Sequence, residues 1–591
     1  LEQLVLPADT TKVFWVAGDG NTRLYAQTAV DSVFTPQTVV DRPDTLMHVG
    51  SNWRRHLRNG AYVEFNSSGQ HIRTVNRARD TTRFAYAGAT LDSIILPTPS
   101  GTKPAYTFSY ATNGASLPVL QSVASPGASG ARTTTVSRSG NWQLTQLEDP
   151  DGTSVYFTWD GNNRITRRKN RLNDSTTYSY DAAGGLTQVS IDMSRGGESA
   201  IVSTFCAAET RTLDSCSGDG TGTTPLPLSS VVTRYDGPRT DSTDVTTFFI
   251  NRFGAPDTVV DAHSNRTRVH RSLMFPALAD SVIDPTSFKQ NAVYTARGLL
   301  QASTAVAPDG GSNATTSYTY DDTWDQLTTV TAPTGEVSYF GYDPTTGNRL
   351  WQRAGANDST TVIFGYNARN QVDSVRAPDH GAAQRFAYDA TLGNDSTVTT
   401  PMGYHTNITR DAIGEPVAVR MQTDVADALP TVQHLTYDVM GRVRVDSTVS
   451  SAFTDTTILG AVQSVSSLAR VVHDSLDAEG DLIRNTRASI PDTSGTTQQT
   501  TFTYDAAHRR RARVEEYSSS DSTWFDPAGN PVGQHTGRGK TIVQTYDALN
   551  RLVQRILPGD TTAQATCACR NNAWTVIGRF RVFSMARIAV M

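Results

Sequence analysis

Apolar and polar positions alternate with a period of two along most of the chain, in short stretches separated by turn residues. Tyr318 and Tyr320 flank a single threonine, and Phe386 and Tyr388 flank a single alanine. Because successive side chains of a strand point to opposite faces, each aromatic pair shares one face of a strand. The pattern predicts short β-strands and little helix.

A turn signal follows each aromatic stretch. Asp181 is followed by Gly184, and Asp438 is followed by Gly441. An Asp side chain can bond to the backbone two residues further on, and glycine tolerates a positive φ. A second alternating stretch then opens with an apolar residue such as Leu186. Each copy of the pattern therefore predicts a β-hairpin.

The hairpin pattern recurs about every 22 residues over long parts of the chain, which indicates a repeat architecture. Weaker copies occur at Phe65, Trp159, Arg410, Leu476 and Phe525. The signature residues of the stronger copies are Tyr180, Asp181, Gly184, Tyr320, Asp321, Tyr342, Asp343, Gly347, Tyr366, Tyr388, Asp389, Tyr437, Asp438, Gly441, Tyr504, Asp505, Tyr546 and Asp547.

A second kind of turn separates one hairpin from the next. It carries a proline, as in "DPDG" at Pro150, "APTG" at Pro333 and "TPMG" at Pro401. Turns that alternate on both edges predict one long antiparallel ribbon. Since isolated hairpins are only marginally stable, successive turns of that ribbon must pair with each other. The predicted fold class is all-β.

Composition agrees with a thin β structure. The chain has 591 residues, is 37% hydrophobic and contains 44 glycines, and its net charge is only -5. Dispersed charge of this size argues against a nucleic-acid groove or an anionic-membrane surface. No apolar run approaches the roughly 18 residues that span a bilayer. We expect no nucleic-acid partner and no membrane insertion by this segment.

The repeated Tyr and Asp could donate and accept protons, but a catalytic pair is needed once and this pair recurs in every repeat. Aromatic packing and turn capping explain the recurrence better. The sequence contains no HExxH motif, no twelve-residue calcium loop and no GxSxG elbow. We therefore predict no catalytic, cofactor-binding or metal-binding residues, and no cofactor.

Four cysteines are present. Cys206 and Cys216 lie in a Gly/Ser/Thr-rich insertion, and either a disulfide between them or two free thiols fits the sequence. Cys567 and Cys569 form a CxC pair near the C-terminus without a second pair at zinc-like spacing.

The repeats resemble the RHS or YD-repeat proteins, which include bacterial polymorphic toxins, insecticidal toxin-complex subunits and the teneurin shell. "WRRHLRNGAYVEFNSSGQHIRTVNRARDTTRFAY" at 53–86 looks like the usual start of an RHS segment, and the resemblance covers roughly residues 50–560. It implies a β-ribbon that spirals into a hollow shell, here incomplete. In some members the shell encloses a toxic C-terminal cargo.

The chain departs from that pattern near its C-terminus. Encapsulating members end with a plug that carries two successive DPxG elements, whereas this chain has a single "FDPAGNPVG" at 525–533, which fits an ordinary repeat. The stretch 561–591 has no acidic residue and no YD signature. We expect a truncated or frameshifted end there, or a fragment of a variable segment.

The sequence suggests three parts: a lead-in β segment at 1–50, a YD-repeat shell at 51–560 with loop-rich insertions at 190–248 and 446–472, and the atypical tail at 561–591. The leading hypothesis is a non-enzymatic, secreted or cell-surface bacterial shell that encapsulates its own C-terminal toxin or a partner cargo. A teneurin-like adhesion protein that binds a surface protein or glycan is the alternative. A glycan-active enzyme is the least favoured hypothesis.

Overall fold

The structure is a computed structural model. It describes residues 1–558 apart from 31, 38–43, 101–103, 113–116, 128–129, 207–230, 252–254, 276, 379–380, 423–430, 451–452, 457–461, 466–467, 491–496 and 517–518. The described residues form β-strands, turns and two short 3-10 helices, η1 (Ser194–Gly196) and η3 (Asp358–Thr360). The all-β prediction is confirmed.

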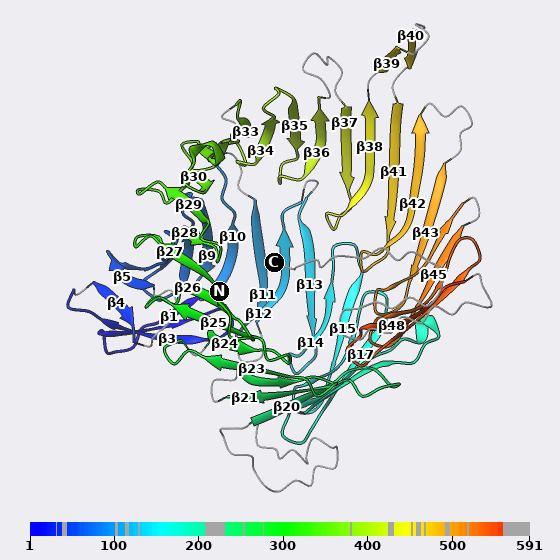
Figure 1. Cartoon of the computed structure of the whole chain (residues 1–591), viewed down its shortest axis with the longest axis horizontal. Coiled ribbons are helices and arrows are strands. Elements are labelled where there is room, and N and C mark those ends of the chain that lie inside the picture. The colour runs from blue at the N-terminus through cyan, green and yellow to red at the C-terminus, as the bar shows by residue number, and fades with distance from the viewer. Residues whose placement is uncertain are drawn as a thin grey trace. The chain divides into compact units, whose positions relative to one another are not determined.

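The strands are short and follow one another with brief connections, as Figure 1 shows. Up to residue 260 they are β1 (Gln3–Val5), β2 (Lys12–Val16), β3 (Thr22–Gln27), β4 (Val33–Pro36), β5 (Thr45–Val49), β6 (Asn52–His56), β7 (Tyr62–Phe65), β8 (His71–Val75), β9 (Thr81–Ala87), β10 (Thr90–Ile95), β11 (Ala105–Thr112), β12 (Pro118–Ser125), β13 (Arg132–Arg138), β14 (Leu144–Glu148), β15 (Ser154–Trp159), β16 (Ile165–Lys169), β17 (Ser175–Tyr180), β18 (Leu186–Ile191), β19 (Ile201–Cys206), β20 (Val231–Asp236), β21 (Val245–Ile250) and β22 (Pro256–Val260).

The later strands continue the same pattern. They are β23 (Arg266–Arg271), β24 (Ala279–Ile283), β25 (Lys289–Tyr294), β26 (Leu300–Val306), β27 (Ala314–Tyr320), β28 (Leu327–Thr331), β29 (Val337–Tyr342), β30 (Arg349–Ala354), β31 (Val362–Tyr366), β32 (Val372–Arg376), β33 (Gln384–Tyr388), β34 (Asp395–Thr399), β35 (His405–Arg410), β36 (Pro416–Met421), β37 (Thr431–Tyr437), β38 (Val443–Ser450), β39 (Phe453–Thr456), β40 (Val462–Val465), β41 (Leu468–Leu476), β42 (Leu482–Ile490), β43 (Gln498–Tyr504), β44 (Arg510–Glu515), β45 (Ser520–Phe525), β46 (Pro531–His535), β47 (Thr541–Tyr546) and β48 (Leu552–Ile556).

Strand pairing makes one antiparallel sheet of 46 strands, and β39 and β40 form a separate two-stranded sheet. Strands pair with their neighbours in the chain, and β38 pairs with β41 across the small hairpin. At the turn end of a typical hairpin, Tyr180 lies opposite Leu186 and the register shifts between Ser179 and Tyr180. Such a bulge accommodates a tight turn and increases the local twist. The predicted hairpin ribbon is confirmed.

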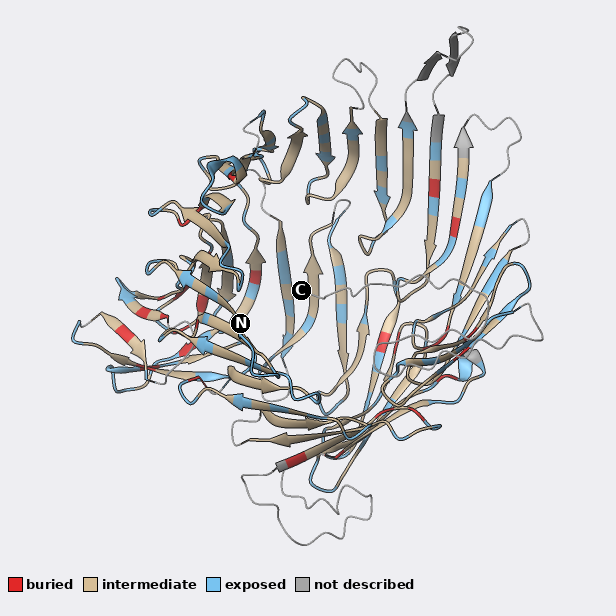
Figure 2. Ribbon diagram, viewed as in Figure 1, coloured by how far each residue is buried: buried red, intermediate tan, exposed pale blue. Residues whose placement is uncertain are grey.

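Two faces of the ribbon differ in exposure, as the alternating colours along many strands in Figure 2 show. In β17, Tyr178 and Tyr180 are half-buried on one face, whereas Thr177 and Ser179 are exposed on the other. The large aromatic side chains cover their own face, and the short hydroxyl side chains leave the opposite face open. A single layer of strands is therefore amphipathic.

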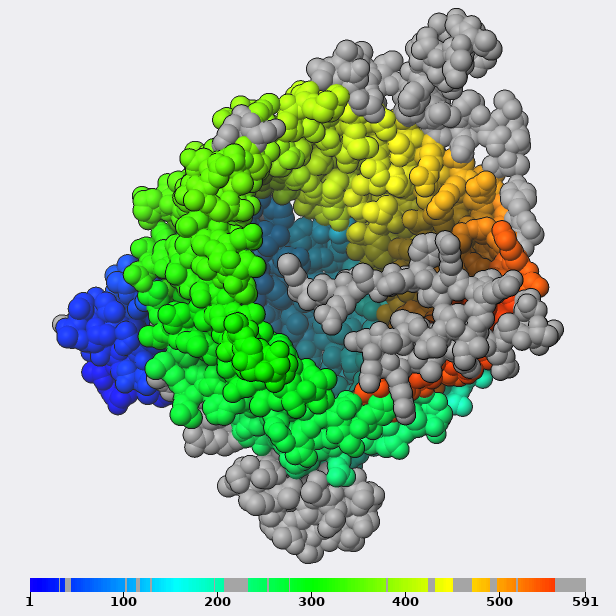
Figure 3. All heavy atoms as spheres, in the orientation of Figure 1, coloured from blue at the N-terminus to red at the C-terminus, as the bar shows by residue number. Residues whose placement is uncertain are grey.

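The described chain divides into two compact units. Unit 1 comprises Leu1–Arg138, Leu147–Gly152 and Arg268–Arg470, and unit 2 comprises Ser139–Gln146, Thr153–Thr267 and Val471–Met591. Each unit thus combines an earlier pass of the ribbon with a later pass that follows it much further along the chain. In unit 1, Figure 3 shows blue atoms of the N-terminal residues beside green atoms of the later pass.

The first strands of unit 1 enclose the cluster of buried hydrophobic residues. Its members come from β1 to β7 and are Leu4, Val13, Tyr25, Phe34, Leu46, Val63 and Phe65, with Trp15 and Trp53 against them. Beside them lies the buried carboxylate of Asp44, which accepts hydrogen bonds from the Tyr25 hydroxyl (2.6 Å), from Arg23 (3.1 Å) and from Arg55. Burial, and then the neighbouring Asp44, raise the pKa of Tyr25 to about 12.

The predicted part boundaries coincide only loosely with these elements. Val49 of β5 pairs with Asn52 of β6 across residue 50, so the lead-in segment continues directly into the ribbon. The stretch 190–248 contains β19 and β20, which pair with each other in the main sheet, and its residues 207–230 lie outside the described residues. The stretch 446–472 contains the separate β39 and β40 hairpin. The tail at 561–591 lies outside the described residues.

Candidate functional site

The signature aspartates each begin a turn and accept hydrogen bonds from its backbone. The Asp181 carboxylate accepts from the N–H groups of Ala183 (2.8 Å) and Gly185 (2.9 Å). Longer turns use both oxygens, since Asp389 accepts from Thr391 (2.9 Å) through one oxygen and from Asn394 (2.8 Å) through the other. The carboxylate therefore replaces backbone partners that a tight turn leaves unpaired.

The next-to-last residue of each of these turns has a positive φ. Gly184 (φ 92°) and Gly441 (φ 82°) fill that position in two repeats, whereas Asn370 (59°), His508 (60°) and Asn550 (60°) fill it in others. Glycine adopts this conformation freely and asparagine adopts it at modest cost. This explains why the signature glycine is missing from several repeats that are otherwise complete.

The signature tyrosines join one hairpin to the preceding hairpin. Each hydroxyl donates to the backbone carbonyl of the residue that opens the second strand of the hairpin before it. The pairs are Tyr180 to Ile165 (2.8 Å), Tyr320 to Leu300 (2.8 Å), Tyr342 to Leu327 (2.8 Å), Tyr366 to Arg349 (2.8 Å), Tyr388 to Val372 (2.6 Å), Tyr437 to Pro416 (2.7 Å), Tyr504 to Leu482 (3.1 Å) and Tyr546 to Pro531 (3.3 Å).

Burial raises the pKa of Tyr342, Tyr437 and Tyr504, which keeps these hydroxyls protonated as donors. Sequence analysis missed one member of the set, Tyr294, and named Trp159 only as a weaker copy of the repeat. Tyr294 donates to the carbonyl of Ala279 (2.7 Å) in the same way, and the indole of Trp159 donates to Leu144 (2.6 Å). In both cases the signal in the sequence is an aromatic residue with a hydrogen-bond donor at the end of a hairpin's first strand.

The two edges of the ribbon carry different turns. We call the turns that follow the signature tyrosine YD turns, such as 181–185, and the turns that join successive hairpins linker turns, such as 170–174. In each unit, YD turns of the later pass lie against linker turns of the earlier pass. We call this line of contacts the seam; its hydrogen-bonded partners are 283 to 313 residues apart in the chain.

In unit 1 the seam combines ion pairs with a backbone contact. Arg132, which begins β13 directly after a linker turn, donates two hydrogen bonds to the Glu415 carboxylate (2.9 and 3.1 Å) at a YD turn. The N–H of Ser100 donates to the carbonyl of Thr391 (3.3 Å). Two further contacts join Arg369 to Asp80 (3.3 Å) and Arg442 to Asp151 (3.3 Å).

In unit 2 guanidinium groups also donate to backbone carbonyls of YD turns. Arg239, whose side chain is 2% exposed, donates to the carbonyls of Tyr546 (3.1 Å) and Asp547 (2.7 Å). Arg195 donates to the carbonyl of Asp505 (2.9 Å). A turn capped by its own aspartate presents these carbonyls in a fixed direction, so the YD turn is also the docking edge.

Further seam contacts in unit 2 are ionic. The Glu479 carboxylate accepts from the backbone N–H (2.6 Å) and the guanidinium (3.3 Å) of Arg171. The Glu198 carboxylate accepts from Arg511 and lies 3.5 Å from Arg509. Arginine suits this edge because its planar fork can bind a carboxylate or a carbonyl in a defined orientation.

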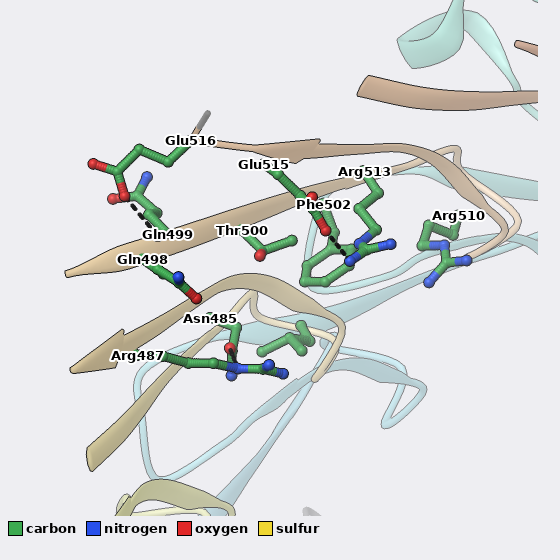
Figure 4. A pocket seen from close by; sticks show the side chains of 11 residues that line it. Asn485, Arg487, Gln498, Gln499, Thr500, Phe502, Arg510, Arg513, Glu515 and Glu516 are labelled. Carbon is green, nitrogen blue, oxygen red and sulfur yellow. Dashed lines mark hydrogen bonds and ion pairs between the residues drawn. The ribbon is translucent and has the colours of Figure 1, made fainter. Parts of the chain in front are cut away.

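A polar cavity of about 380 Å³ lies on the face of β42 to β44, and Figure 4 shows the side chains that line it. Its glutamates are engaged, since Glu515 pairs with Arg513 and Glu516 accepts from the N–H of Gln499 (2.9 Å). Arg487 donates to Asn485 (2.8 Å) within the same cavity. The lining residues are Leu482, Asn485, Arg487, Gln498, Gln499, Thr500, Phe502, Arg510, Arg513, Glu515 and Glu516.

Within the described part of the chain, no three His, Cys, Asp or Glu side chains gather as a metal ion would require. Nor do the described residues include a helix long and apolar enough to cross a membrane. Cys206 ends β19 and is buried, whereas Cys216 lies outside the described residues, so their disulfide stays a prediction.

No family model matches the sequence, and no curated protein matches it. Among solved structures, the crystal structure of TcdB2-TccC3 is similar, with 12% identity and a TM-score of 0.32 over 93% of this chain and 35% of that chain. TcdB2-TccC3 without its hypervariable C-terminal region gives 12% and 0.33, covering 93% and 34%. The Tc holotoxin pore of Photorhabdus luminescens gives 11% and 0.33, also covering 93% and 34%. The chain spans about a third of the length of these proteins.

Proposed function

We propose that the chain is a non-enzymatic wall segment of an RHS-type shell that encloses a protein cargo. The observation that carries this proposal is the seam. A hairpin ribbon alone is a narrow strip, and edge-to-edge docking of an earlier and a later pass makes it a continuous surface. A wall that is only one layer of strands thick can separate two spaces while using few residues.

The use of the signature residues supports a structural role. The aspartate carboxylates accept hydrogen bonds from the backbone of their turns, and the tyrosine hydroxyls donate to neighbouring backbone carbonyls. The repeated polar groups therefore already have partners. A general acid or base needs a group that is free to exchange protons with a substrate. The polar cavity in Figure 4 follows the same rule, because its two glutamates are engaged within the protein.

The nature of the cargo and the location of the protein are inferred from the sequence resemblance to RHS proteins. By that resemblance the cargo is the protein's own C-terminal toxin or a partner chain, and the protein is secreted or exposed on a bacterial surface. The near-neutral charge of the chain, -5 over 591 residues, suits a wall that does not bind nucleic acid.

Electron cryomicroscopy of the natural full-length protein tests the proposal. We expect density for a second segment of the same chain, or for a co-purified chain, within the space that the ribbon walls off. A protease should spare that segment until the wall is unfolded. The cargo hypothesis would be contradicted if the space walled off in the complete protein contained only solvent and the protease cleaved every segment without prior unfolding.

A teneurin-like adhesion role is the second candidate, because β39 and β40 form a hairpin outside the main sheet. Loops on a rigid scaffold are common binding sites. Replacing residues 451–467 with a short Gly/Ser linker would then abolish binding to a target cell surface and leave the ribbon folded. Unchanged binding, or no binding by the intact protein, would remove this candidate.

A further inference from the structure

The seam occupies one edge of each pass, and the opposite edges are only partly covered. On the YD edge of the earlier pass the turn 66–70 meets β1, since the N–H of Leu4 donates to the carbonyl of Gly69 (2.9 Å). The turns 139–143 and 181–185 of the earlier pass and 332–336 and 536–540 of the later pass include exposed residues, and we call these turns open. The exposure of identical sequences shows the difference. Ala182 and Ala183 of an open YD turn are exposed, whereas Ala506 of a docked YD turn is 5% exposed.

A tryptophan forms part of the docked seam in unit 1. Trp324 belongs to the YD turn that follows Tyr320, and its ring lies against Gly60 of a linker turn. A β-carbon built on Gly60 would come within 2.3 Å of a ring carbon of Trp324, so a larger residue would displace the ring from this position. Gly60 also has a φ of 82°, which suits glycine. In this contact the indole ring of Trp324 packs against a turn that has no side chain at Gly60.

A second tryptophan stands on an open YD edge, in unit 2. Trp142 lies in the turn 139–143 and is 45% exposed. Its φ is 65°, at the turn position that Asn163 (61°) and Asn550 (60°) occupy in other repeats. A bulky residue is strained in this conformation, and such strain persists where it serves a function. Aromatic residues held outward in this way commonly anchor interfaces.

The open linker edge offers the matching surface. Gly335 (φ 86°) and Gly539 (φ 72°) occupy linker turns of the later passes at the position that Gly60 occupies in the docked linker turn. Apart from each glycine and its two chain neighbours, no atom of the described residues lies within 4 Å of a β-carbon built on either glycine. Both turns are exposed. Each is therefore a bare glycine turn with room for an indole ring.

We propose that the open YD edge, with Trp142 as its anchor, docks onto the open linker edge of a second copy of this chain. The contact would repeat between molecules what Trp324 and Gly60 make within one molecule, so the new interface continues an existing one. The two edges differ, and association is therefore head to tail. The inference does not depend on a cargo.

Sedimentation velocity of the purified chain over a wide concentration range tests this proposal. We expect wild type to form dimers and larger head-to-tail species as concentration rises. Trp142→Asn should weaken association by at least about tenfold, because an interface anchor is lost. Asparagine is already the residue at this position in other repeats, so the variant should keep the wild-type circular dichroism spectrum.

Trp524→Ala is the matched control, since Trp524 is also exposed (41%) but lies within strand β45. It should change association by less than about twofold.

Gly335→Asn and Gly539→Asn keep the positive φ accessible but add a side chain to each glycine turn, and at least one of them should weaken association. A wild-type chain that stays monomeric, alone or while binding a different polypeptide, would overturn the proposal. So would equal association of Trp142→Asn and Trp524→Ala, or association that survives both glycine variants.

Discussion

Each signature tyrosine both covers one face of the ribbon and ties its hairpin to the preceding one. Phenylalanine could provide the cover, but it could not donate to the carbonyl that opens the neighbouring strand. The hydroxyl therefore explains why the repeat prefers tyrosine. In the Phe525 repeat, where the hydroxyl is absent, Arg509 links the turn to its neighbour by donating to the carbonyl of Asp526 (2.8 Å). Arg164 makes the same contact to the carbonyl of Asp181 (3.1 Å) in addition to the Tyr180 hydroxyl bond.

Tyr437→Phe should destabilise its hairpin by about 1 kcal/mol, because a hydrogen bond is lost and the Pro416 carbonyl loses its donor. Native-state hydrogen exchange of β36 and β37 measures this as a lower free energy of local opening. Tyr156→Phe is the control, since Tyr156 is 42% exposed, and it should change exchange by less than about 0.5 kcal/mol. Equal effects of the two changes would show that the hydroxyl bond contributes nothing.

His71 should make the first strands of unit 1 sensitive to acid. Burial lowers its pKa from 6.5 to about 4, and its ring lies 4.2 Å from that of Phe84. The unfolded chain binds a proton in this range and the folded chain does not, so stability is full above pH 6.5 and falls as the pH approaches 4. The loss is up to about 3 kcal/mol.

Hydrogen exchange of β7 to β9 between pH 7 and pH 4, corrected for the intrinsic exchange rate, measures this loss. His71→Phe keeps a ring beside Phe65 and Phe84 but has no titrating group. The variant should lose most of the pH dependence over this range. An equally steep loss in the variant would assign the acid sensitivity to other groups.

At the scale of elements, the same turn sequence has two different environments in unit 2. Asp-Ala-Ala occurs at 181–183, on an open edge, and at 505–507, on the docked edge, where Asp505 is fully buried. The repeat sequence alone determines that a turn forms. Its burial depends on which pass the turn belongs to.

Ala506→Arg should therefore destabilise the docked turn by about 1 to 3 kcal/mol, because a large side chain is forced into a filled contact. Ala182→Arg, the same change in the same local sequence, should stay within about 0.5 kcal/mol. Thermal unfolding of the two variants, followed by circular dichroism, makes the comparison. Similar melting temperatures for both would contradict the docking of the later pass.

The ion pair between Arg132 and Glu415 allows a charge-swap test of the seam in unit 1. Arg132→Glu places two carboxylates together and should destabilise the contact by about 2 kcal/mol, and Glu415→Arg should do the same. The double swap should recover at least half of that loss. Hydrogen exchange of the two turns gives the readout, and strictly additive losses in the double variant would mean that the residues do not touch.

At the scale of the whole molecule, the sequence predicted the hairpins well and the contacts between passes hardly at all. Alternation and turn residues are local signals, so the strands around Tyr180 and Tyr437 could be predicted from a few neighbouring residues. The partner of Arg132 lies 283 residues away and leaves no local pattern. The roles of Gly60 and Arg239 depend on the same long-range docking, and sequence analysis therefore missed them.

The buried cluster of β1 to β7 was also missed, because residues 1–50 were interpreted only as a lead-in and the stretch from residue 53 only as the start of the repeats. Its members alternate along several short strands, and each strand contributes only one or two of them. Such a cluster emerges when the strands pair, as for Leu4, whose N–H donates to the carbonyl of Gly69 (2.9 Å) in a turn far along the chain.

Disulfide trapping across the seam tests most directly that an earlier and a later pass lie edge to edge. The backbones of Ser100 and Thr391 are in hydrogen-bond contact (3.3 Å), so we expect their α-carbons to lie near the spacing that a disulfide bridges. We expect Ser100→Cys with Thr391→Cys to form a cross-link under mild oxidation of the native protein, identified by mass spectrometry of the linked peptides. Ser100→Cys with Thr345→Cys, which uses another YD turn, should stay unlinked. Equal linking of the two pairs, or no link in either, would contradict the account of the ribbon as a wall built of docked passes.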